Sequence, residues 1–283
     1  MSSAQRSWTP YLLVAAPAGF LLFFFILPAA SLLSASLMEY DGSLPTGEWT
    51  LENFELLLTR PLYINAILRT FVIGGAVGLL VVILAYPLAY FLVRTTSTWR
   101  NLLIALSLAP LLASVIVRTY GWWVILNRDG AINVVLQSVG VIDKPLIMLP
   151  SSIAIVLGLA HALLPYGVLT IMASLNGLNP NLERAAMGLG ASRTRTFLAV
   201  TLPLTAPGII GGFLLAFSIA ISAYATPAIL GGPSTEVMAT MIRNFMVSTL
   251  DWGPGAAMGA ILIASAVALL LLTSWVGDRK RTA

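Results

Sequence analysis

Six long apolar stretches constrain this chain of 283 residues more than any other feature of its sequence. They cover residues 11–37, 65–93, 102–126, 151–175, 207–230 and 255–276. None of them contains Asp or Glu. A helix that crosses a hydrocarbon core about 30 Å thick needs about 20 apolar residues, and each stretch is long enough. The sequence therefore predicts an all-α integral membrane protein with six transmembrane helices.

Composition excludes several other classes of protein. Hydrophobic residues make up 58% of the chain and charged residues 9%, whereas a soluble domain has about 25% charged residues. A soluble protein of this composition could not hydrate its surface, and disorder needs low hydrophobicity and high charge. With no Cys and one His, the chain offers no disulfide framework, no thiol nucleophile and no Cys-ligated or multi-histidine metal site. We therefore expect no metal, and the net charge of +4 is no sign of a nucleic-acid partner.

The positions of the charged residues predict the orientation of the six helices. If both termini are cytoplasmic, the inside segments hold nine Lys or Arg residues and two acidic residues. The outside segments then hold four basic and nine acidic residues. Cytoplasmic loops are enriched in Lys and Arg, so this topology agrees with the rule and the opposite one does not. Arg69 and Arg118 lie in or at the ends of their helices, and we interpret Arg69 as an interfacial anchor.

The segments between the apolar stretches differ in character. On the predicted outer side, residues 38–63 contain turn residues and then an amphipathic run at helical spacing, which predicts a short interfacial helix. On the inner side, residues 176–206 form a long, basic, Ala-rich loop. We expect residues 1–64 to hold the first helix and outer loop, residues 65–276 to form a five-helix core, and residues 277–283 to form a basic cytoplasmic tail.

The inner loop has the pattern of a helix, a glycine break and a second helix. Asn181 can cap the first helix, and Gly188 and Gly190 interrupt it. Ser192 can cap a second helix that reaches to about residue 200, with Pro203 just beyond it. Two interpretations stay open on physical grounds alone. The loop either forms a docking knob for a partner protein or lies on the surface of anionic lipid.

This loop resembles the EAA loop of permease subunits in bacterial ABC importers of the type I fold. The pattern there is Glu-Ala-Ala, three residues, Gly, nine residues and Ile-x-Leu-Pro. Its positions are occupied here by Ala185, Ala186, Gly190, Leu202 and Pro203, with Val200 in place of Ile. Arg184 stands where the pattern has Glu, and Glu183 lies one residue earlier. The loop precedes the fifth of six helices, as in that family, and the resemblance covers residues 65–276.

The resemblance implies a non-catalytic permease subunit in the bacterial inner membrane. It also implies an ABC ATPase dimer that binds ATP and Mg, a second permease subunit that is a related, non-identical chain, and an extracytoplasmic solute-binding protein. The chain has no Gly-x-x-x-x-Gly-Lys-Ser/Thr motif, so it cannot bind ATP through a P-loop, and we expect no cofactor of its own. The residues that the resemblance places against the ATPase are Glu183, Arg184, Ala185, Ala186, Gly188, Gly190, Ala191, Ser192 and Pro203.

Two further segments are similar to the spermidine/putrescine class of these permeases. One covers residues 110–122 and is followed by Gly130 and Asn133, and the other covers residues 226–232. That class also includes members that carry other small polar solutes. A polyamine-like solute is therefore the leading hypothesis for the cargo.

Polar residues inside the predicted third helix are candidates for the translocation pathway. Four residues recur every four positions and would share one face of a continuous helix: Pro110, Ser114, Arg118 and Trp122. An Arg at membrane depth is costly unless it faces protein or water. Arg118 either lines the pathway or its outer gate, or extends to the outer headgroups beside an aromatic belt that includes Tyr120.

The predicted fourth and fifth helices carry further candidates. Hydroxyl residues in the fifth helix recur every four positions, which predicts a polar stripe that faces a cavity or another helix. The candidates there are Ser218, Ser222 and Thr226, with Tyr224 nearby. Gly211 and Gly212 are better explained by close helix packing. In the fourth helix, His161 is either a hydrogen-bonded core residue or part of the pathway.

Other classes of membrane protein are alternatives. An ion-coupled secondary transporter commonly uses intramembrane carboxylates and inverted repeats, and neither is visible here. A channel acting without an ATPase would not need the inner loop pattern. A membrane hydrolase would need a nucleophile with a base or metal ligands, and no carboxylate shares the depth of His161.

Overall fold

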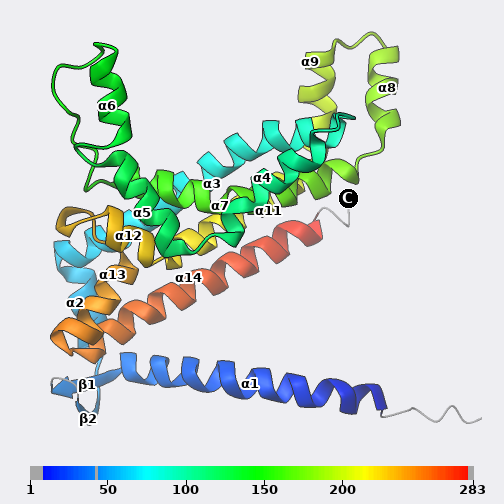
Figure 1. Ribbon diagram of the computed structural model, residues 1–283. Helices are drawn as coiled ribbons and strands as arrows, with labels where there is room; N and C mark the ends of the chain where they lie inside the picture. Colours follow the sequence, from blue (N-terminus) through cyan, green and yellow to red (C-terminus); the bar gives the residue numbers. More distant parts are fainter. Residues whose placement is uncertain (1–8, 42–43, 280–283) are drawn as a thin grey trace, which may run out of the picture. The chain divides into compact units, whose positions relative to one another are not determined.

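The computed structural model describes the backbone of residues 9–41 and 44–279 (Figure 1). The longer helices are α1 (Thr9–Ser36), α3 (Pro61–Arg94), α7 (Ser152–Asn176), α11 (Ala206–Ser222) and α14 (Trp252–Arg279). The shorter ones are α2 (Glu52–Thr59), α4 (Arg100–Leu112), α5 (Val115–Leu126), α6 (Ala131–Ser138), α8 (Pro180–Gly188), α9 (Arg193–Thr196), α10 (Leu202–Leu204), α12 (Ala225–Leu230) and α13 (Met238–Arg243). Between them lie two π-helical segments, η1 (Phe197–Thr201) and η3 (Asn244–Thr249), and a 3-10 turn, η2 (Pro233–Thr235). Strands β1 (Met38–Asp41) and β2 (Leu44–Trp49) pair in antiparallel fashion.

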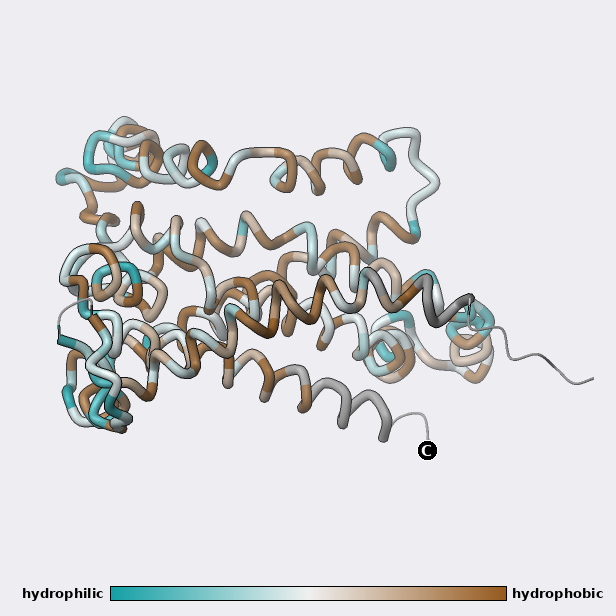
Figure 2. The backbone as a smooth tube through the Cα atoms, turned by 90° about the horizontal axis from the view of Figure 1, so that it is seen from below, coloured by the Kyte–Doolittle hydropathy of each residue, from teal (hydrophilic) through white to brown (hydrophobic). Residues whose placement is uncertain are grey.

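The prediction of six membrane helices is matched by four helices and two bent pairs. Within the described residues, α1, α3, α7 and α14 are long and apolar enough to cross a membrane. Two pairs pass the same test only together, namely Arg100–Leu112 with Val115–Ser138, and Arg193–Leu204 with Ala206–Ser222. Hydrophobic residues line the long helices, whereas hydrophilic residues gather in the connections at their ends (Figure 2). The chain is therefore an all-helical membrane protein apart from the short strand pair.

The predicted third helix is bent, which corrects the expectation that its polar residues share one face. α4 makes an angle of 100° with the following segment, Val115–Ser138, which begins with α5, and the helix breaks between them where Ala113 has an extended backbone. Pro110 weakens the helix before the bend, because it has no N–H and its ring crowds the preceding turn. The carbonyl of Pro110, which Ser114 would bond in a continuous helix, accepts a hydrogen bond from Nη1 of Arg118. Arg118 thus replaces a missing backbone donor at the bend.

The predicted fifth helix is also interrupted. α11 ends at Ser222, Ala223 is extended, and α12 restarts at Ala225. Pro227 cannot donate to the carbonyl of Ala223, so a continuous helix would lose one bond there. The expected single stripe of Ser218, Ser222 and Thr226 is therefore wrong, because Thr226 belongs to a separate helix.

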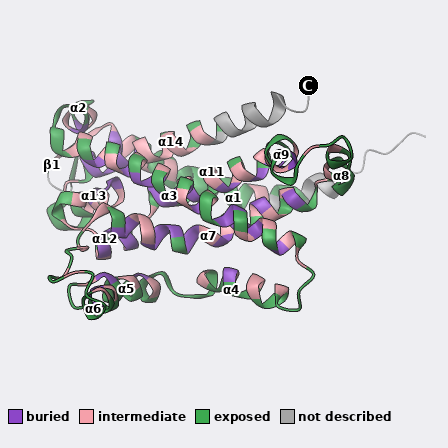
Figure 3. Ribbon diagram, turned by 90° about the horizontal axis from the view of Figure 1, so that it is seen from above, coloured by how far each residue is buried: buried purple, intermediate pink, exposed green. Residues whose placement is uncertain are grey.

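The larger of two compact units, residues 62–241 and 264–283, has α7 at its centre. The buried surface of α7 runs along most of its length (Figure 3). Its side chains share one hydrophobic core with residues of α3 and α11. The buried members include Val77, Val81, Ile155, Leu159, Leu163, Ala216 and Ala220. Packing of these three helices against one another builds the frame from which the connecting segments project.

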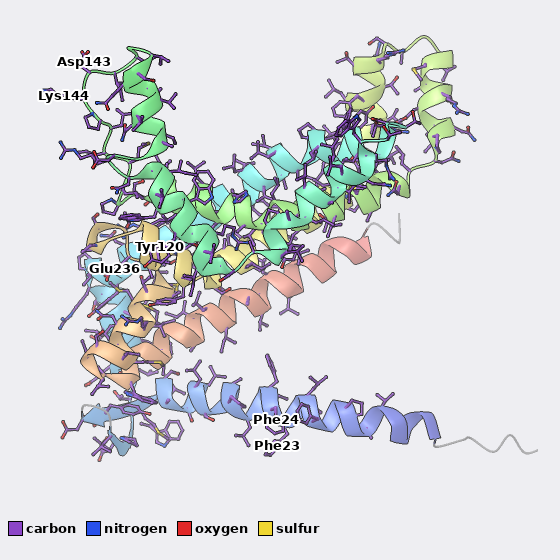
Figure 4. The ribbon with its side chains drawn as sticks, viewed as in Figure 1. Phe23, Phe24, Tyr120, Asp143, Lys144 and Glu236 are labelled. Carbon is purple, nitrogen blue, oxygen red and sulfur yellow. The ribbon has the colours of Figure 1, made fainter. Side chains whose placement is uncertain are left out.

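The smaller unit consists of residues 1–61 and 242–263, and its described part contains the predicted interfacial helix, α2. Asn53 of α2 is buried, and its Nδ2 donates to the carbonyls of Ser36 at 3.1 Å and Met38 at 2.8 Å. These bonds tie α2 to the end of α1. The strand pair was not predicted, because a short exposed hairpin leaves little hydrophobic pattern. Residues 20–28 of α1 are all exposed, and Phe23 and Phe24 project from this helix (Figure 4).

Glycines allow α7 and α11 to approach closely, and the packing expected for Gly211 and Gly212 is confirmed for Gly212 and wrong for Gly211. A Cβ added at Gly212 would lie 2.7 Å from Oγ1 of Thr170, and one added at Gly208 would lie 2.8 Å from the Thr170 carbonyl oxygen. A Cβ added at Gly211 would meet nothing within 4 Å. The contact between the two helices therefore depends on Gly208 and Gly212.

We predict that Gly208→Ala destabilises the protein while Gly211→Ala does not. The Thr170 carbonyl belongs to the backbone of α7 and cannot rotate away, so overpacking should lower the free energy of unfolding by about 1–3 kcal/mol. The control Gly211→Ala adds the same atom to the same helix in open space and should not lower it, because Ala favours a helix over Gly by up to about 1 kcal/mol. Thermal unfolding of both variants in detergent measures the difference. Equal thermal midpoints for the two variants would contradict the close packing of Gly208 against Thr170.

Candidate functional site

The inner loop forms a helical hairpin, residues 180–196, made of α8, a short turn and α9. Asn179 caps α8, since its Oδ1 accepts a hydrogen bond from the backbone N–H of Asn181 at 3.0 Å. Pro180 occupies the first helical position, where a missing N–H costs nothing. The prediction that Asn181 is the cap is wrong by two residues. The side chain of Ser192 caps α9, as predicted, by accepting from the N–H of Arg195 at 3.3 Å.

The turn of the hairpin needs a glycine at one position. Gly190 has a φ of 90°, in the left-handed region that residues with a Cβ rarely adopt. Gly188, by contrast, is the last residue of α8 and has ordinary helical geometry. The predicted glycine break is therefore confirmed, and Gly190 is the residue on which its shape depends.

The second helix continues past the predicted end near residue 200. After α9 it passes through η1 and then α10, which contains Pro203. The N–H of Leu202 bonds the carbonyl of Phe197, five residues earlier, so the hydrogen-bond ladder is shifted by one residue before the proline. This shift accommodates a residue that cannot donate. Pro203 thus lies inside the helical segment rather than beyond it.

Glu183 is held inside the protein by two partners. Its Oε1 forms an ion pair with Nη2 of Arg94 at the end of α3, and the two side chains are 15% and 32% exposed. The same oxygen accepts a hydrogen bond from Oγ1 of Thr201 at 2.7 Å. One carboxylate therefore connects α8 and η1 of the loop to α3, which lies far away in the sequence.

Three residues of α3 at a spacing of four form a stripe that receives the loop: Tyr86, Tyr90 and Arg94. The hydroxyl of Tyr86 lies 3.0 Å from Oγ1 of Thr205. The ring of Phe197 meets Tyr86 and Tyr90 edge-on, with centroid distances of 5.7 and 5.6 Å. Arg94 lies over the ring of Tyr90, 5.7 Å from its centroid. The α3 stripe and the loop are thus joined by polar and aromatic contacts along two turns.

The other predicted loop residues lie mainly on the surface. Arg184, Ala185, Gly188, Gly190, Ser192 and Pro203 are exposed, while Ala186 and Ala191 are half-buried. The hairpin projects from one end of the larger unit, and α6 projects from the opposite end (Figures 1 and 3). The surface residues are therefore available to a partner on that side.

A second group of predicted residues meets between α5 and α7. Nε1 of Trp122 donates to Nδ1 of His161 at 3.2 Å. Arg118 is close enough to His161 and Tyr166 for electrostatic interaction with both. His161 is exposed, so it is hydrogen-bonded but is not a core residue. The structure thus brings Arg118, Trp122 and His161 together on an accessible surface.

The remaining pathway candidates are scattered. Ser114 lies at the bend, and Tyr120, Ser222 and Tyr224 are exposed, with Tyr120 labelled in Figure 4. Ser218 is half-buried, and the Ser222 hydroxyl bonds the carbonyl of Ser218 at 3.2 Å. Thr226 is buried, and its Oγ1 lies 3.2 Å from Oγ1 of Thr119. Thr119 was not predicted from the sequence, in which its signal is a spacing of three from Trp122.

The predicted outer side carries polar contacts of its own. Arg69 donates from Nη1 to the carbonyl of Glu236 at 2.9 Å, so it holds a loop of the protein. Burial raises the pKa of the Asp251 carboxyl, just before α14, above its usual value. In the part of the chain that the structure describes, no group of three potential metal-ligating side chains is found.

Comparison with known proteins gives a consistent result. The family model described as "Binding-protein-dependent transport system inner membrane component" matches residues 7–282. The spermidine/putrescine transport system permease protein PotB of Escherichia coli is 32% identical over 262 residues, which are 92% of this chain and 94% of that protein. The protein of the same name from Haemophilus influenzae is 30% identical over 260 residues, or 92% and 90% of the two chains.

A solved structure has the same fold. A chain of a bacterial ABC transporter involved in the import of the acidic polysaccharide alginate superposes with a TM-score of 0.77. The match covers 98% of this chain and 96% of that chain, at 18% identity. At this level of identity the likeness extends to the fold.

We predict that Arg94 and Glu183 stabilise the fold as a pair. The variants Arg94→Met and Glu183→Gln, alone and combined, should give a coupling energy of roughly 1 kcal/mol, because the pair is partly shielded from water. Thermal unfolding in detergent measures this cycle. The control cycle pairs Glu183→Gln with Arg184→Met, whose exposed guanidinium neighbours Glu183 in sequence, and its coupling should be close to zero. A coupling as large for Arg184 as for Arg94 would refute the contact.

Proposed function

We propose that this chain, which belongs to the family of binding-protein-dependent transport system inner membrane components, forms the pathway for a small polyamine-like solute. Family membership makes it a transmembrane permease subunit of an ATP-driven ABC importer in the bacterial inner membrane. It is a non-catalytic subunit, because ATP is hydrolysed by a separate ATPase subunit. An ion-coupled transporter or channel without an ATPase is therefore set aside.

The partners follow from the same membership. An ABC ATPase, a second permease subunit and an extracytoplasmic solute-binding protein work with this chain. That the second permease subunit is related but non-identical stays a prediction. ATP and Mg belong to the ATPase in this proposal.

One observation carries the proposed mechanism, namely the attachment of the helical hairpin to α3. Glu183 connects α8 to Arg94 and Thr201, and Phe197 packs on Tyr86 and Tyr90. A force on the hairpin therefore reaches α3, which packs with α7 and α11 in one core. Closure of the ATPase dimer would move the hairpin and these helices together. Alternating access to the pathway between the two permease subunits follows from that movement.

The charge of the chain supports a cationic solute. The segments on the outer side hold nine acidic and four basic residues, and a negative surface raises the local concentration of cations. Arg118 would repel a polyamine, and its Nη1 donates to the Pro110 carbonyl, which gives it a role in the bend instead of in solute contact. The relatives named for spermidine and putrescine support the same solute class. We interpret Arg118 as a structural residue and His161, with Trp122, as the better candidate for the pathway.

We predict that Gly190→Ala uncouples ATP hydrolysis from uptake. A Cβ at a φ of 90° costs roughly 1–2 kcal/mol, so the turn of the hairpin should change shape. The complex reconstituted in proteoliposomes should transport at least threefold less solute per ATP hydrolysed. The control Gly188→Ala adds a Cβ in open space at helical geometry and should behave like the parent protein. A normal ratio in Gly190→Ala would argue against the role of the loop.

We predict that the importer takes up spermidine or putrescine. The binding protein co-purified with the complex should gain thermal stability with either amine, and unlabelled putrescine should compete with labelled spermidine for ATP-dependent uptake. A neutral amino acid and a dicarboxylate serve as controls. Uptake driven by the ATPase that ignores both amines would reject the solute class and leave the permease assignment in place.

A further inference from the structure

The charges of the helical hairpin are divided between its inside and its outside. Glu183 is the sole acidic residue in residues 176–206, and its carboxylate is engaged by Arg94 and Thr201. Arg184, Arg193 and Arg195 are exposed. The outward surface therefore carries three positive charges and no negative charge to balance them.

The end of the hairpin adds an apolar element to this surface. Leu189 is 90% exposed, next to the left-handed Gly190, and Met187 is also exposed. Leu198 extends the exposed apolar surface along the second helix. An apolar tip flanked by arginines suits a groove with an apolar floor and acidic walls.

We propose that the ATPase subunit receives the hairpin in such an acidic groove, where carboxylates pair with Arg184, Arg193 and Arg195 and an apolar floor contacts Leu189. This inference rests on the proposed function, in which the loop meets the ATPase. Guanidinium groups form planar, bidentate hydrogen bonds with carboxylates, which makes the partner chemistry specific. Arg184 has the opposite charge to the Glu that the loop pattern places at this position. An ATPase adapted to an acidic loop should therefore bind this chain poorly.

A protein groove fits the geometry better than a lipid surface. The hairpin projects beyond the end of α3 instead of lying along the bundle (Figures 1 and 3). No residue of α8 is buried, and its attachment to α3 and η1 runs through the single side chain of Glu183. A helix that lies in a membrane surface would instead turn a continuous apolar face to the lipid. Anionic lipid remains as the rival outcome of the experiment.

The first experiment reverses the charges. The complex that carries Arg184→Glu, Arg193→Glu and Arg195→Glu together is purified in mild detergent, and the retained ATPase is quantified at increasing NaCl. The triple variant should retain at least tenfold less ATPase at low salt, and added salt should release ATPase from the parent complex. The control Arg128→Glu reverses one charge on an exposed residue outside the hairpin, compared with three in the triple variant, and should retain the ATPase.

Misfolding is separated from lost docking by neutral variants. Arg184→Ala and Arg193→Ala remove charge from exposed positions without adding repulsion, and each should weaken ATPase retention at moderate salt while the thermal midpoint stays unchanged. Full retention in both the triple and the neutral variants would overturn the acidic groove. If Gly190→Ala still uncoupled transport in that case, the proposed function would stand without this inference. If no ATPase co-purified with the parent complex, both the proposed function and the acidic groove would be overturned.

The second experiment distinguishes protein from lipid as the occupant. The chain has no cysteine, so Leu189→Cys provides a single thiol. In nanodiscs of zwitterionic or anionic lipid, a water-soluble maleimide should label this thiol at the same rate without the ATPase. Added ATPase should slow labelling at least tenfold in both lipids. Protection by anionic lipid alone would assign the surface to the membrane and overturn the proposal.

Discussion

Backbone polar groups that face hydrocarbon must find partners within the protein, and this constraint shapes each interrupted helix of the chain. At the bend between α4 and α5, the Arg118 side chain donates to the Pro110 carbonyl. Before Pro203, a π-helical segment shifts the bonding pattern by one residue, so that a residue without an N–H fits into the helix. The prolines can therefore bend the helices without leaving a large number of unpaired groups.

The same frame explains how a surface loop can act on the membrane helices. The helical hairpin has little buried surface of its own, and it is joined to the α3 stripe through Glu183 and through the contacts of η1 and Thr205, which follow it in the loop. Those contacts combine an ion pair, a hydroxyl pair and edge-on aromatic packing, which resist displacement in different directions. α3 in turn shares the core of α7 and α11, where Gly208 and Gly212 bring the backbones close. A displacement of the hairpin is thus carried by packed elements rather than by a flexible connection.

Hydropathy and charge made the membrane helices and the loop predictable, because both depend on local composition. The bends were not predictable from periodicity, since an apolar run has the same pattern whether or not Ala113 is extended. The partner of Glu183 was also out of reach, because Arg94 lies 89 residues away in the sequence. The cap at Asn179 was missed although Pro180 marks the first helical position, a signal that could have identified it. The roles of the candidate pathway residues depend on contacts with a second subunit and stay predictions.

The opposite directions of two neighbouring residues have an evolutionary consequence. Glu183 turns inward to Arg94, whereas Arg184 faces solvent. Substitutions at the outward position change which protein recognises the loop, and they leave the internal linkage intact. Gene duplication could therefore yield permeases that exchange one ATPase for another through a few surface substitutions, while the mechanical part of the transporter is inherited unchanged.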